Sequence, residues 1–382
     1  MNVLITGGAG FIGSALARRL AARGDCAVSV LDNLSPQIHG ALADFSADLK
    51  SMARCIKADV TEARDWAKAL EGQDAVFHLA AETGTGQSMY EMARYTNVNV
   101  TGTALLFEAL RRGGRRPRKV VIASSRAVYG EGKYECTNCG TMQPTSRSAK
   151  QMQHGDFEIH CSRCNTSMTP AATEEAFPLH PVSVYAATKV AQEHLAYACQ
   201  MTSDTAVACL RFQNVYGPGQ SLRNPYTGIL SIFSERILNG QKISVFEDGS
   251  ESRDFVYIDD VVDAMTAVVE LDLAPWTVLN IGTGVPTSVS DVVRTLLRVY
   301  GAETPWEISG QFRLGDIRHN YADIRLAERE LGFKARWSLE KGLGELCAWV
   351  RQSCPPPIDL DGSFRELERH GLLGTALRAD RP

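Results

Sequence analysis

Apolar and polar positions follow two alternating periods along the first half of the chain. Short apolar runs predict β-strands, and the segments between them, whose apolar residues recur every three to four positions, predict helices. Strands that alternate with helices form right-handed βαβ units, so the pattern predicts an α/β fold with a doubly wound parallel sheet. The predicted strands are Asn2–Thr6, Ala27–Leu31, Arg54–Ala58, Ala75–Leu79, Lys119–Ser124 and Ala206–Phe212, and the predicted helices are Phe11–Arg23, Glu62–Leu70, Tyr90–Arg112 and Val184–Met201.

Two departures from this alternation predict the domain organisation. Residues 134–170 are polar and contain four paired cysteines, so we expect them to be an insertion in a first domain, residues 1–212. After about residue 213, Gly and Pro become frequent and the strands become isolated. We therefore expect a smaller α/β region over residues 213–350, interleaved with the first domain, and a charged C-terminal tail over residues 351–382.

Composition excludes several classes of protein. The 382 residues include 40 Lys and Arg against 44 Asp and Glu, a formal net charge of −4. This balance gives no electrostatic basis for binding nucleic acid or an anionic membrane. No apolar run approaches the roughly 20 residues that cross a bilayer. The N-terminus runs directly into a strand without a basic segment or a cleavage site, so we expect a cytoplasmic protein.

A glycine-rich turn follows the first predicted strand and opens the first predicted helix. It contains Gly7, Gly10 and Gly13 around Phe11 and Ile12. Glycines at this spacing allow the backbone to approach a pyrophosphate, which the amides at the helix N-terminus then bind. Asp32 follows Gly13 by 19 residues, at the end of the second strand, where a carboxylate accepts a hydrogen bond from a ribose 2′-hydroxyl and repels a 2′-phosphate. Alone, Asp32 is an ordinary turn residue; in this context the pattern predicts a Rossmann domain that binds NAD.

Tyr185 and Lys189 are four residues apart in a predicted helix and therefore share one face. A tyrosine with a pKa of about 10 is a poor base near neutral pH, but a nearby ammonium group and an oxidised nicotinamide favour the phenolate. Ser124 ends the fifth predicted strand and Ser125 follows it, at the sheet edge where ligands bind. This arrangement predicts a tyrosine base assisted by a serine hydroxyl.

These motifs, in this order, resemble the extended short-chain dehydrogenase/reductases, specifically the NAD-dependent nucleotide-sugar epimerases and dehydratases. The resemblance covers about residues 1–345. The matching segments are Thr6–Gly13, Asp32-Asn33, Ala58–Val60, His78–Ala81, Asn97–Asn99, Ser124–Gly130, Tyr185–Lys189, Leu210–Pro218, Arg253–Val256, Asn280–Gly282 and Gly315–Arg318.

The resemblance implies a role for each matched position. Tyr185 is the catalytic base, Lys189 also holds the nicotinamide ribose, and Ser125 is the catalytic hydroxyl, which also contacts the substrate. Asn214, Arg253 and Arg318 are implied to hold the diphosphate of the nucleotide sugar, and a planar guanidinium suits that group. The family also implies a homodimer through the helices Tyr90–Arg112 and Val184–Met201. The remaining implied NAD contacts are Asn33, Asp59 and Val60 near the adenosine, and Leu79, Ala80, Ala81, Asn99 and Ser124 along the cofactor.

The residues after Ser125 separate the possible reactions. Family dehydratases carry an acidic pair there, whereas this chain has Arg126 and Ala127, so elimination would lack its acid and base. We therefore expect epimerisation at C4 of a nucleotide sugar through a 4-keto intermediate, with Arg126 either in contact with the substrate or pointing away. The segment Ser124–Gly132 with the insertion also resembles a bacterial subgroup that includes dTDP-L-rhamnose 4-epimerases, which make dTDP-6-deoxy-L-talose. A 4-ketoreductase and a 4,6-dehydratase remain alternatives.

Two Cys-x-x-Cys pairs lie in the insertion, Cys136 with Cys139 and Cys161 with Cys164. This spacing is typical of a zinc ribbon, and four thiolates leave no open coordination position, so we expect a structural zinc ion. Free or redox-active thiols are the alternative. Zinc ribbons also serve as binding modules, so an NAD-sensing protein that acts through the insertion remains a hypothesis of a different class.

Overall fold

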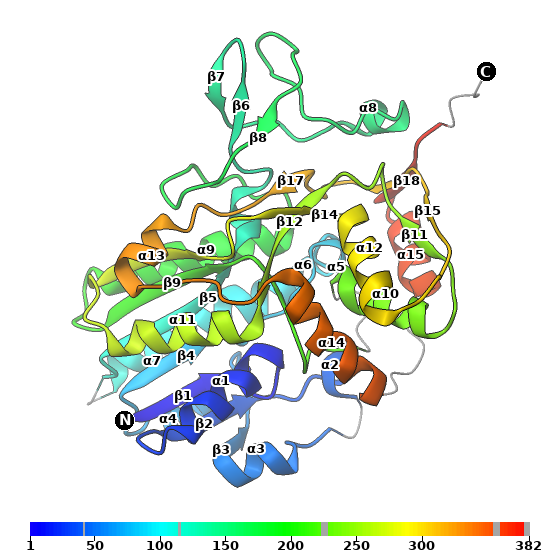
Figure 1. Ribbon diagram of the computed structural model, residues 1–382. Helices are drawn as coiled ribbons and strands as arrows, with labels where there is room; N and C mark the ends of the chain where they lie inside the picture. The colour runs from blue at the N-terminus through cyan, green and yellow to red at the C-terminus, as the bar shows by residue number, and fades with distance from the viewer. Residues whose placement is uncertain (41–42, 114–115, 223–227, 354–359, 378–382) are drawn as a thin grey trace.

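The computed structural model describes residues 1–40, 43–113, 116–222, 228–353 and 360–377. At its centre is a seven-stranded parallel sheet in the order β13-β9-β5-β4-β1-β2-β3 (Figure 1). The predicted doubly wound α/β fold is therefore confirmed. Strand β1 pairs with β2 on one side and with β4 on the other, so the strand order reverses there. The strands are β1 (Asn2–Thr6), β2 (Ala27–Asp32), β3 (Arg54–Lys57), β4 (Ala75–His78), β5 (Lys119–Ser125), β9 (Ala206–Phe212) and β13 (Trp276–Ile281).

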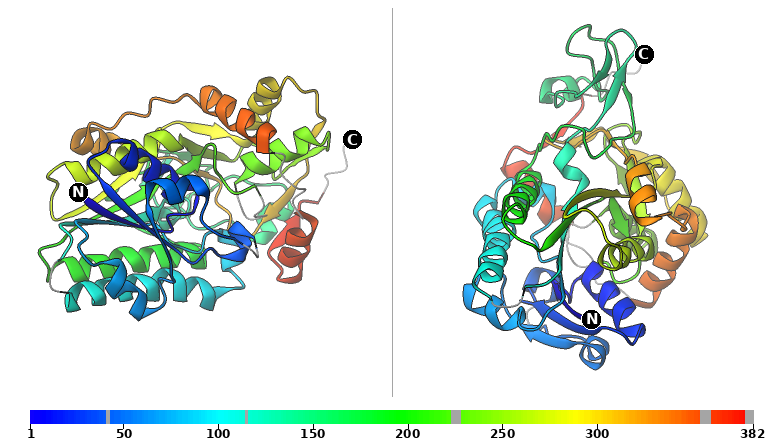
Figure 2. Two further views of the ribbon diagram at one scale, coloured as in Figure 1. Left: turned by 90° about the horizontal axis from the view of Figure 1, so that it is seen from below. Right: turned by 90° about the vertical axis from the view of Figure 1, so that its left-hand side faces the viewer.

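Helices cover both faces of this sheet (Figure 2). Alternate residues of β1 face opposite cores, because side chains along a strand alternate between the two faces. Val3 and Ile5 belong to one apolar cluster and Leu4 to the other. The helices that flank the sheet are α1 (Phe11–Ala22), α3 (Ala47–Met52), α4 (Ala63–Ala69), α7 (Gly102–Arg112), α9 (Val184–Gln200), α11 (Ile258–Glu270) and α13 (Arg325–Leu331). Within the described ranges, the helices lack the length and apolar content needed to cross a membrane.

The long predicted helix at Tyr90–Arg112 is interrupted in the structure. It consists of α6 (Met92–Tyr95), a π-helical turn at Thr96–Thr101 and α7. Such turns are rare and occur frequently at functional sites. Three short helices follow the carboxyl ends of strands β2, β4 and β5 in turn: α2 (Pro36–His39), α5 (Thr85–Ser88) and a 3₁₀ turn at Arg126–Tyr129.

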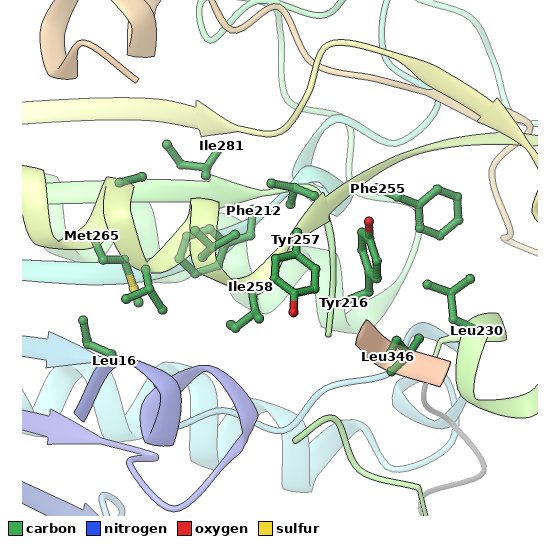
Figure 3. Packing of buried hydrophobic residues seen from close by; sticks show 14 of the residues in the cluster. Leu16, Phe212, Tyr216, Leu230, Phe255, Tyr257, Ile258, Met265, Ile281 and Leu346 are labelled. Atoms are coloured by element: carbon green, nitrogen blue, oxygen red, sulfur yellow. The ribbon is translucent and has the colours of Figure 1, made fainter. Parts of the chain in front are cut away.

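The second region shares its core with the first domain (Figure 3). Leu16 of α1 and Leu346 of α14 belong to one cluster of buried side chains. Within it, the rings of Tyr216 and Tyr257 meet edge to face with centroids 5.6 Å apart. The elements of this region are β10 (Asn214–Tyr216), α10 (Ile229–Leu238), β11 (Ile243–Val245), β12 (Ser252–Tyr257), β14 (Pro286–Ser288), α12 (Val289–Tyr300), β15 (Trp306–Ile308), β16 (Gln311–Arg313), β17 (His319–Asn320) and α14 (Leu339–Ser353).

The insertion projects from the body, on the side away from the N-terminus (Figure 1). It consists of β6 (Tyr134–Cys136), β7 (Gly140–Met142), α8 (Ala149–Gln153) and β8 (Thr169–Pro170), with β6 as the central strand of a small antiparallel sheet. Tyr134, Ile159 and Met168 form a small core with two of the cysteines.

The described part of the tail folds back onto the molecule. Helix α15 (Leu360–Arg369) leads into β18 (Leu373–Thr375), which pairs antiparallel with β16. The Tyr90 ring stacks on His370 with centroids 4.6 Å apart, and the Leu377 amide donates to the Gln153 carbonyl over 2.7 Å. The tail therefore contacts the first domain, the second region and the insertion.

A buried ion pair joins β9 to α9 next to the predicted catalytic strand. The Arg211 guanidinium donates to both carboxylate oxygens of Glu193, at 2.9 and 2.7 Å, and both side chains are almost completely buried. The Ser124 hydroxyl donates to the same carboxylate over 2.5 Å. This pair fixes the end of β5 against the helix that carries Tyr185 and Lys189.

We expect Arg211→Met to lower the free energy of unfolding by about 3–5 kcal/mol, because it leaves the Glu193 carboxylate buried without its counterion. Urea denaturation followed by circular dichroism measures this loss. Arg294→Met is the control: Arg294 pairs with Asp291 on the surface, and such pairs contribute about 1 kcal/mol or less. Equal losses in the two variants would show that the buried pair contributes nothing beyond a surface pair.

Candidate active site

A cavity of about 580 Å³ lies at the carboxyl ends of the strands, where the strand order reverses between β1 and β4. This is the position at which open parallel sheets bind their ligands. The predicted cofactor residues that line it are Gly7, Gly10, Phe11, Ile12, Gly13, Asp32, Asn33, Val60, Leu79, Ala80, Ala81 and Ser124. The predicted catalytic and substrate residues that line it are Ser125, Arg126, Tyr185, Lys189 and Asn214.

The glycine turn is packed too tightly to accept side chains. Gly7 has a φ of +67°, and a Cβ there would lie 2.8 Å from the Ala80 amide nitrogen. A Cβ on Gly13 would lie 2.4 Å from the Gly7 carbonyl oxygen. Glycine at these two positions therefore brings the start of α1 directly against β1, with the helix N-terminus open to the cavity. This geometry fits the pyrophosphate of a dinucleotide.

Asp32 stands at the end of β2, where the adenosine ribose of such a ligand would lie. Its carboxylate accepts hydrogen bonds from the amides of Ala9, at 3.0 Å, and Leu34, at 2.9 Å. A carboxylate oxygen can accept more than one hydrogen bond, so each retains capacity for a ribose hydroxyl. The negative charge disfavours a 2′-phosphate, and the site fits NAD.

Two predicted cofactor residues support the cavity from behind rather than line it. Asp59 accepts hydrogen bonds from the Asn33 amide, at 2.9 Å, and from Thr61. Asn99 is fully buried in the π-helical turn, where its side chain accepts from the Glu82 amide at 2.8 Å and donates to Thr188. Asn99 thus ties the cavity-lining Glu82 segment to α9.

Tyr185 and Lys189 reach the cavity from one face of α9, whose first turn is capped by the Ser183 hydroxyl. The Lys189 ammonium donates to the Ala123 carbonyl over 2.9 Å and lies 5.9 Å from the Tyr185 ring centroid. Burial lowers the pKa of Lys189 to about 8. Burial also raises the pKa of Tyr185, and hydrogen bonding with Ser125 opposes that rise.

Arg126 is the cation whose charge acts on the phenol. It follows Ser125 directly, lines the cavity and donates from Nε to the Asn214 side-chain oxygen over 2.6 Å. Its positive charge lowers the pKa of Tyr185, whereas burial lowers its own pKa to about 9. The expectation that Lys189 and the nicotinamide favour the phenolate therefore omits one charge, that of Arg126.

The structure does not place Arg253 and Arg318 on the cavity wall. Arg253 is 7% exposed and donates to the carbonyls of Ile317, at 2.6 Å, and Arg318, at 2.9 Å. Arg318 is fully buried, and its guanidinium is bound by Glu158, Glu247 and Asp248 at 2.5–2.8 Å. Four carboxylates within 4 Å surround Arg318 once Glu251 is included, so we do not propose it as a diphosphate ligand.

The sequence patterns did not single out Arg313, which lies five residues before Arg318. Its Nε is buried without a hydrogen-bond partner, and its guanidinium lies over the rings of Phe246 and Phe364, 5.0 and 5.8 Å from their centroids. Burial lowers its pKa, and Asp316 is the acidic group that opposes this. Arg313 and Asp316 line a small cavity beside Ser183. Its position two residues before the matched Gly315–Arg318 segment is the signal that could have identified it.

The four paired cysteines of the insertion converge. Their Sγ atoms all lie within 4.8 Å of one another, and the Sγ atoms of Cys136 and Cys164 are 3.5 Å apart. A tetrahedral zinc ion with Zn–S bonds of about 2.3 Å needs sulfur atoms roughly 3.8 Å apart. The donor set and its spacing therefore fit a tetrahedral metal site.

Comparison with known proteins agrees with this geometry. Residues 3–154 and 159–282 match the NAD dependent epimerase/dehydratase family. The chain is 43% identical over 353 residues to a dTDP-L-rhamnose 4-epimerase of Burkholderia thailandensis, covering 92% of this chain and 95% of that protein. It is 33% identical to a UDP-glucose 4-epimerase of Mycolicibacterium smegmatis, covering 92% and 99%.

Solved structures show the same arrangement of elements. MoeE5 in complex with UDP-glucuronic acid and NAD is 31% identical with a TM-score of 0.73, covering 92% of this chain and all of that one. UDP-glucuronic acid 4-epimerase from Bacillus cereus, in complex with UDP-glucuronic acid and NAD, is 25% identical with a TM-score of 0.76, covering 92% and 100%. Because the family match spans most of the chain and these relatives align over nearly their whole lengths, the chain belongs to the NAD-dependent epimerase/dehydratase family.

Proposed function

We propose that the protein is an NAD-dependent 4-epimerase of a nucleotide-diphospho-sugar. The observation that carries the proposal is the convergence of Ser125, Arg126 and Tyr185 in one cavity that begins at the glycine turn. NAD, when bound there, supplies reversible oxidation at the sugar C4 carbon. Each turnover regenerates it, so the enzyme needs no second redox substrate.

The residues of the chain then handle the proton and the substrate. Tyr185 accepts the proton of the C4 hydroxyl, and hydrogen bonding with Ser125 positions that hydroxyl and the phenol. Lys189 donates to the Ala123 carbonyl and leaves donors for a ribose hydroxyl. When the 4-keto sugar presents its other face, Tyr185 returns the proton and the C4 configuration is inverted.

The diphosphate is proposed to bind between Arg126 and Arg313. Both guanidinium groups, together with Arg253, act on one carboxylate, that of Asp316, so positive charge exceeds negative charge there. A doubly charged diphosphate would balance this excess. Asn214, which binds Arg126, is placed to orient that side chain toward the ligand.

The cavity favours epimerisation over dehydration. Elimination of water needs an acid and a base beside the tyrosine, and the chain places a guanidinium and a methyl group, Arg126 and Ala127, directly after Ser125. The similarity to the Burkholderia thailandensis enzyme further suggests dTDP-L-rhamnose as substrate and dTDP-6-deoxy-L-talose as product.

Incubation of the purified enzyme with dTDP-, UDP- and GDP-sugars, followed by NMR, tests this function. We expect inversion at C4, fastest with dTDP-L-rhamnose, without net formation or loss of NADH. Tyr185→Phe should lower kcat by about 10²–10⁴, since it removes the acid–base group. Tyr197→Phe, on an exposed position of the same helix, should retain activity, because it removes one hydroxyl and keeps the ring that packs on Trp276. Stoichiometric NADH consumption without an epimer would identify a ketoreductase instead.

The pH dependence of kcat tests the role of Arg126. Its charge lowers the pKa of Tyr185, so Arg126→Met should raise that pKa and move the acidic limb of the pH–rate profile to higher pH. Activity should fall most near neutral pH and recover as the pH rises. Arg329→Met, at an exposed position of α13, is the control. An unshifted limb in Arg126→Met would contradict this electrostatic role.

We also propose that the insertion binds one structural zinc ion through Cys136, Cys139, Cys161 and Cys164. The hairpin turn of β6 and β7 presents the first pair, and Gly140 accommodates that turn with a φ of +76°. In the second pair, the Asn165 amide donates to the Cys161 carbonyl over 2.8 Å, closing a tight knuckle. Four thiolates satisfy a tetrahedral ion completely, so no catalytic position remains.

Elemental analysis by mass spectrometry should find about one zinc ion per chain. Cys164→Ser should lose most of this zinc, because three thiolates and a hydroxyl bind it less well, and should make residues 134–170 susceptible to limited proteolysis. Cys199→Ser, outside the cluster, should retain the metal. Full zinc occupancy in Cys164→Ser would contradict the proposed ligand set.

The proposed working form is a homodimer in the cytoplasm. Large apolar side chains are exposed on the two segments of the proposed interface. Tyr197 of α9 is 47% exposed, and Met92 at the start of α6 is 53% exposed. A second copy packed against the helices at 90–112 and 184–201 would cover them. A reducing compartment would keep the four cysteines available as thiolates.

A further inference from the structure

One residue of the insertion is buried in the body of the protein. Arg147 lies between the two cysteine pairs in sequence, yet its side chain is only 2% exposed. Its guanidinium donates to the Phe157 carbonyl at 3.1 Å, to the Glu247 carboxylate at 2.8 Å and to the Asp316 carbonyl at 3.1 Å. A planar group with several donors in a fixed geometry is thus bound to the insertion on one side and to the second region on the other.

Two buried carboxylates depend on this guanidinium. Glu247 accepts from both Arg147 and Arg318, at 2.8 Å each. Glu131 lies 3.8 Å from Arg147 and accepts from the Arg318 amide at 2.7 Å. Burial raises the pKa of Glu131 to about 7, and the charge of Arg147 opposes that rise. Glu131 lies six residues after the end of β5, so Arg147 also contacts the segment that follows Ser125.

We call residues 313–318 the anion loop, since they carry Arg313 and Asp316. Two guanidinium groups donate to three consecutive carbonyls of this loop. Arg147 donates to the carbonyl of Asp316, and Arg253 donates to the carbonyls of Ile317 and Arg318. Desolvation raises the pKa of the Asp316 carboxyl, but the charges of Arg253, Arg313, Arg126 and Arg147 together hold it below the usual range. The position of the loop therefore depends on both arginines.

We propose that Arg147 is a positioning residue of the nucleotide-sugar site, through which the insertion holds the anion loop and sets the affinity for the diphosphate. The proposal rests on the proposed function, in which Arg313 and Arg126 bind that group. Arg147 is enclosed by protein and its charge is compensated by Glu131 and Glu247, so it acts through the loop and not by contact with the ligand.

A positioning role and a purely structural role predict different kinetics. If Arg147 only stabilised the fold, its loss would reduce the amount of active enzyme and leave KM unchanged. If it holds the anion loop, its loss raises KM and weakens binding of a nucleoside diphosphate. The groups that act at C4, Ser125 and Tyr185, lie on β5 and α9 and do not bond to Arg147 within the described residues, so kcat per folded enzyme changes little.

The experiment compares Arg147→Met with Lys150→Met, a substitution at an exposed position of the same insertion. Calorimetric titration of the purified enzyme with dTDP and UDP measures Kd, and turnover of the best substrate from the sugar panel measures KM and kcat. We expect Arg147→Met to raise Kd and KM about tenfold or more, with kcat changed less than about threefold. Lys150→Met should match the wild type, and Arg147→Lys should be intermediate.

Unchanged Kd for both diphosphates in Arg147→Met would overturn the proposal, as would a fall in kcat at unchanged KM. If Arg147→Met does not fold, Arg147→Lys decides, because it keeps the charge but lacks the planar fork through which Nη1 binds Glu247 and Nη2 binds the Asp316 carbonyl. A wild-type Kd in that variant would overturn the proposal. A wild-type enzyme that converts no nucleotide sugar would refute the proposed function instead, while the Kd comparison would still test Arg147.

Discussion

The partial burial of the Tyr185 phenol is the constraint on which the proposed active site depends. Partial burial of Tyr185 makes its ionised form less stable, which opposes its proposed use as a base. The same exclusion of water strengthens the electrostatic interaction between the phenolate and every charge or dipole directed at it. Ser125 and Arg126 supply these from the end of β5, and Lys189 lies on the same helix as the tyrosine. The Arg211–Glu193 pair holds β9 and β5 against α9, so a stabilising interaction also maintains the positions of the proposed catalytic groups.

Most of the parallel sheet could be predicted because its strands are buried on both faces and their sequences are continuously apolar. The strands at 2–6, 27–32, 54–57, 75–78, 119–125 and 206–212 lie within one residue of the predictions. Strand β13 was not predicted, because it joins β9 across an intervening region of isolated strands. The π-helical turn at Thr96–Thr101 was also missed, since the contact of Asn99 with the Glu82 segment that accompanies it is not local in sequence.

The same distinction applies to the site residues. The glycine turn, Asp32, Tyr185 and Lys189 are fixed by spacings within one strand and one helix, so sequence places them correctly on the cavity wall. The arginines of the proposed diphosphate site are placed by partners far away in the chain. Glu158, 160 residues from Arg318, binds its guanidinium from within the insertion, whereas the Nε of Arg313 is left without a partner. The sequence shows that basic residues occur in these segments, but not which of their charges are already paired with carboxylates.

The charged side chains of the insertion indicate that it is not an independent appendage. A buried ion pair across a junction is unfavourable unless both partners are held in place, because each charge must leave water. Arg147 and Glu158 nevertheless enter the body, where they meet Glu247 and Arg318. Phe157, whose carbonyl accepts a hydrogen bond from Arg147, lies four residues before Cys161. A metal ion bound by that cysteine would restrict the segment that holds Arg147, and would thereby connect the outer end of the insertion to the anion loop.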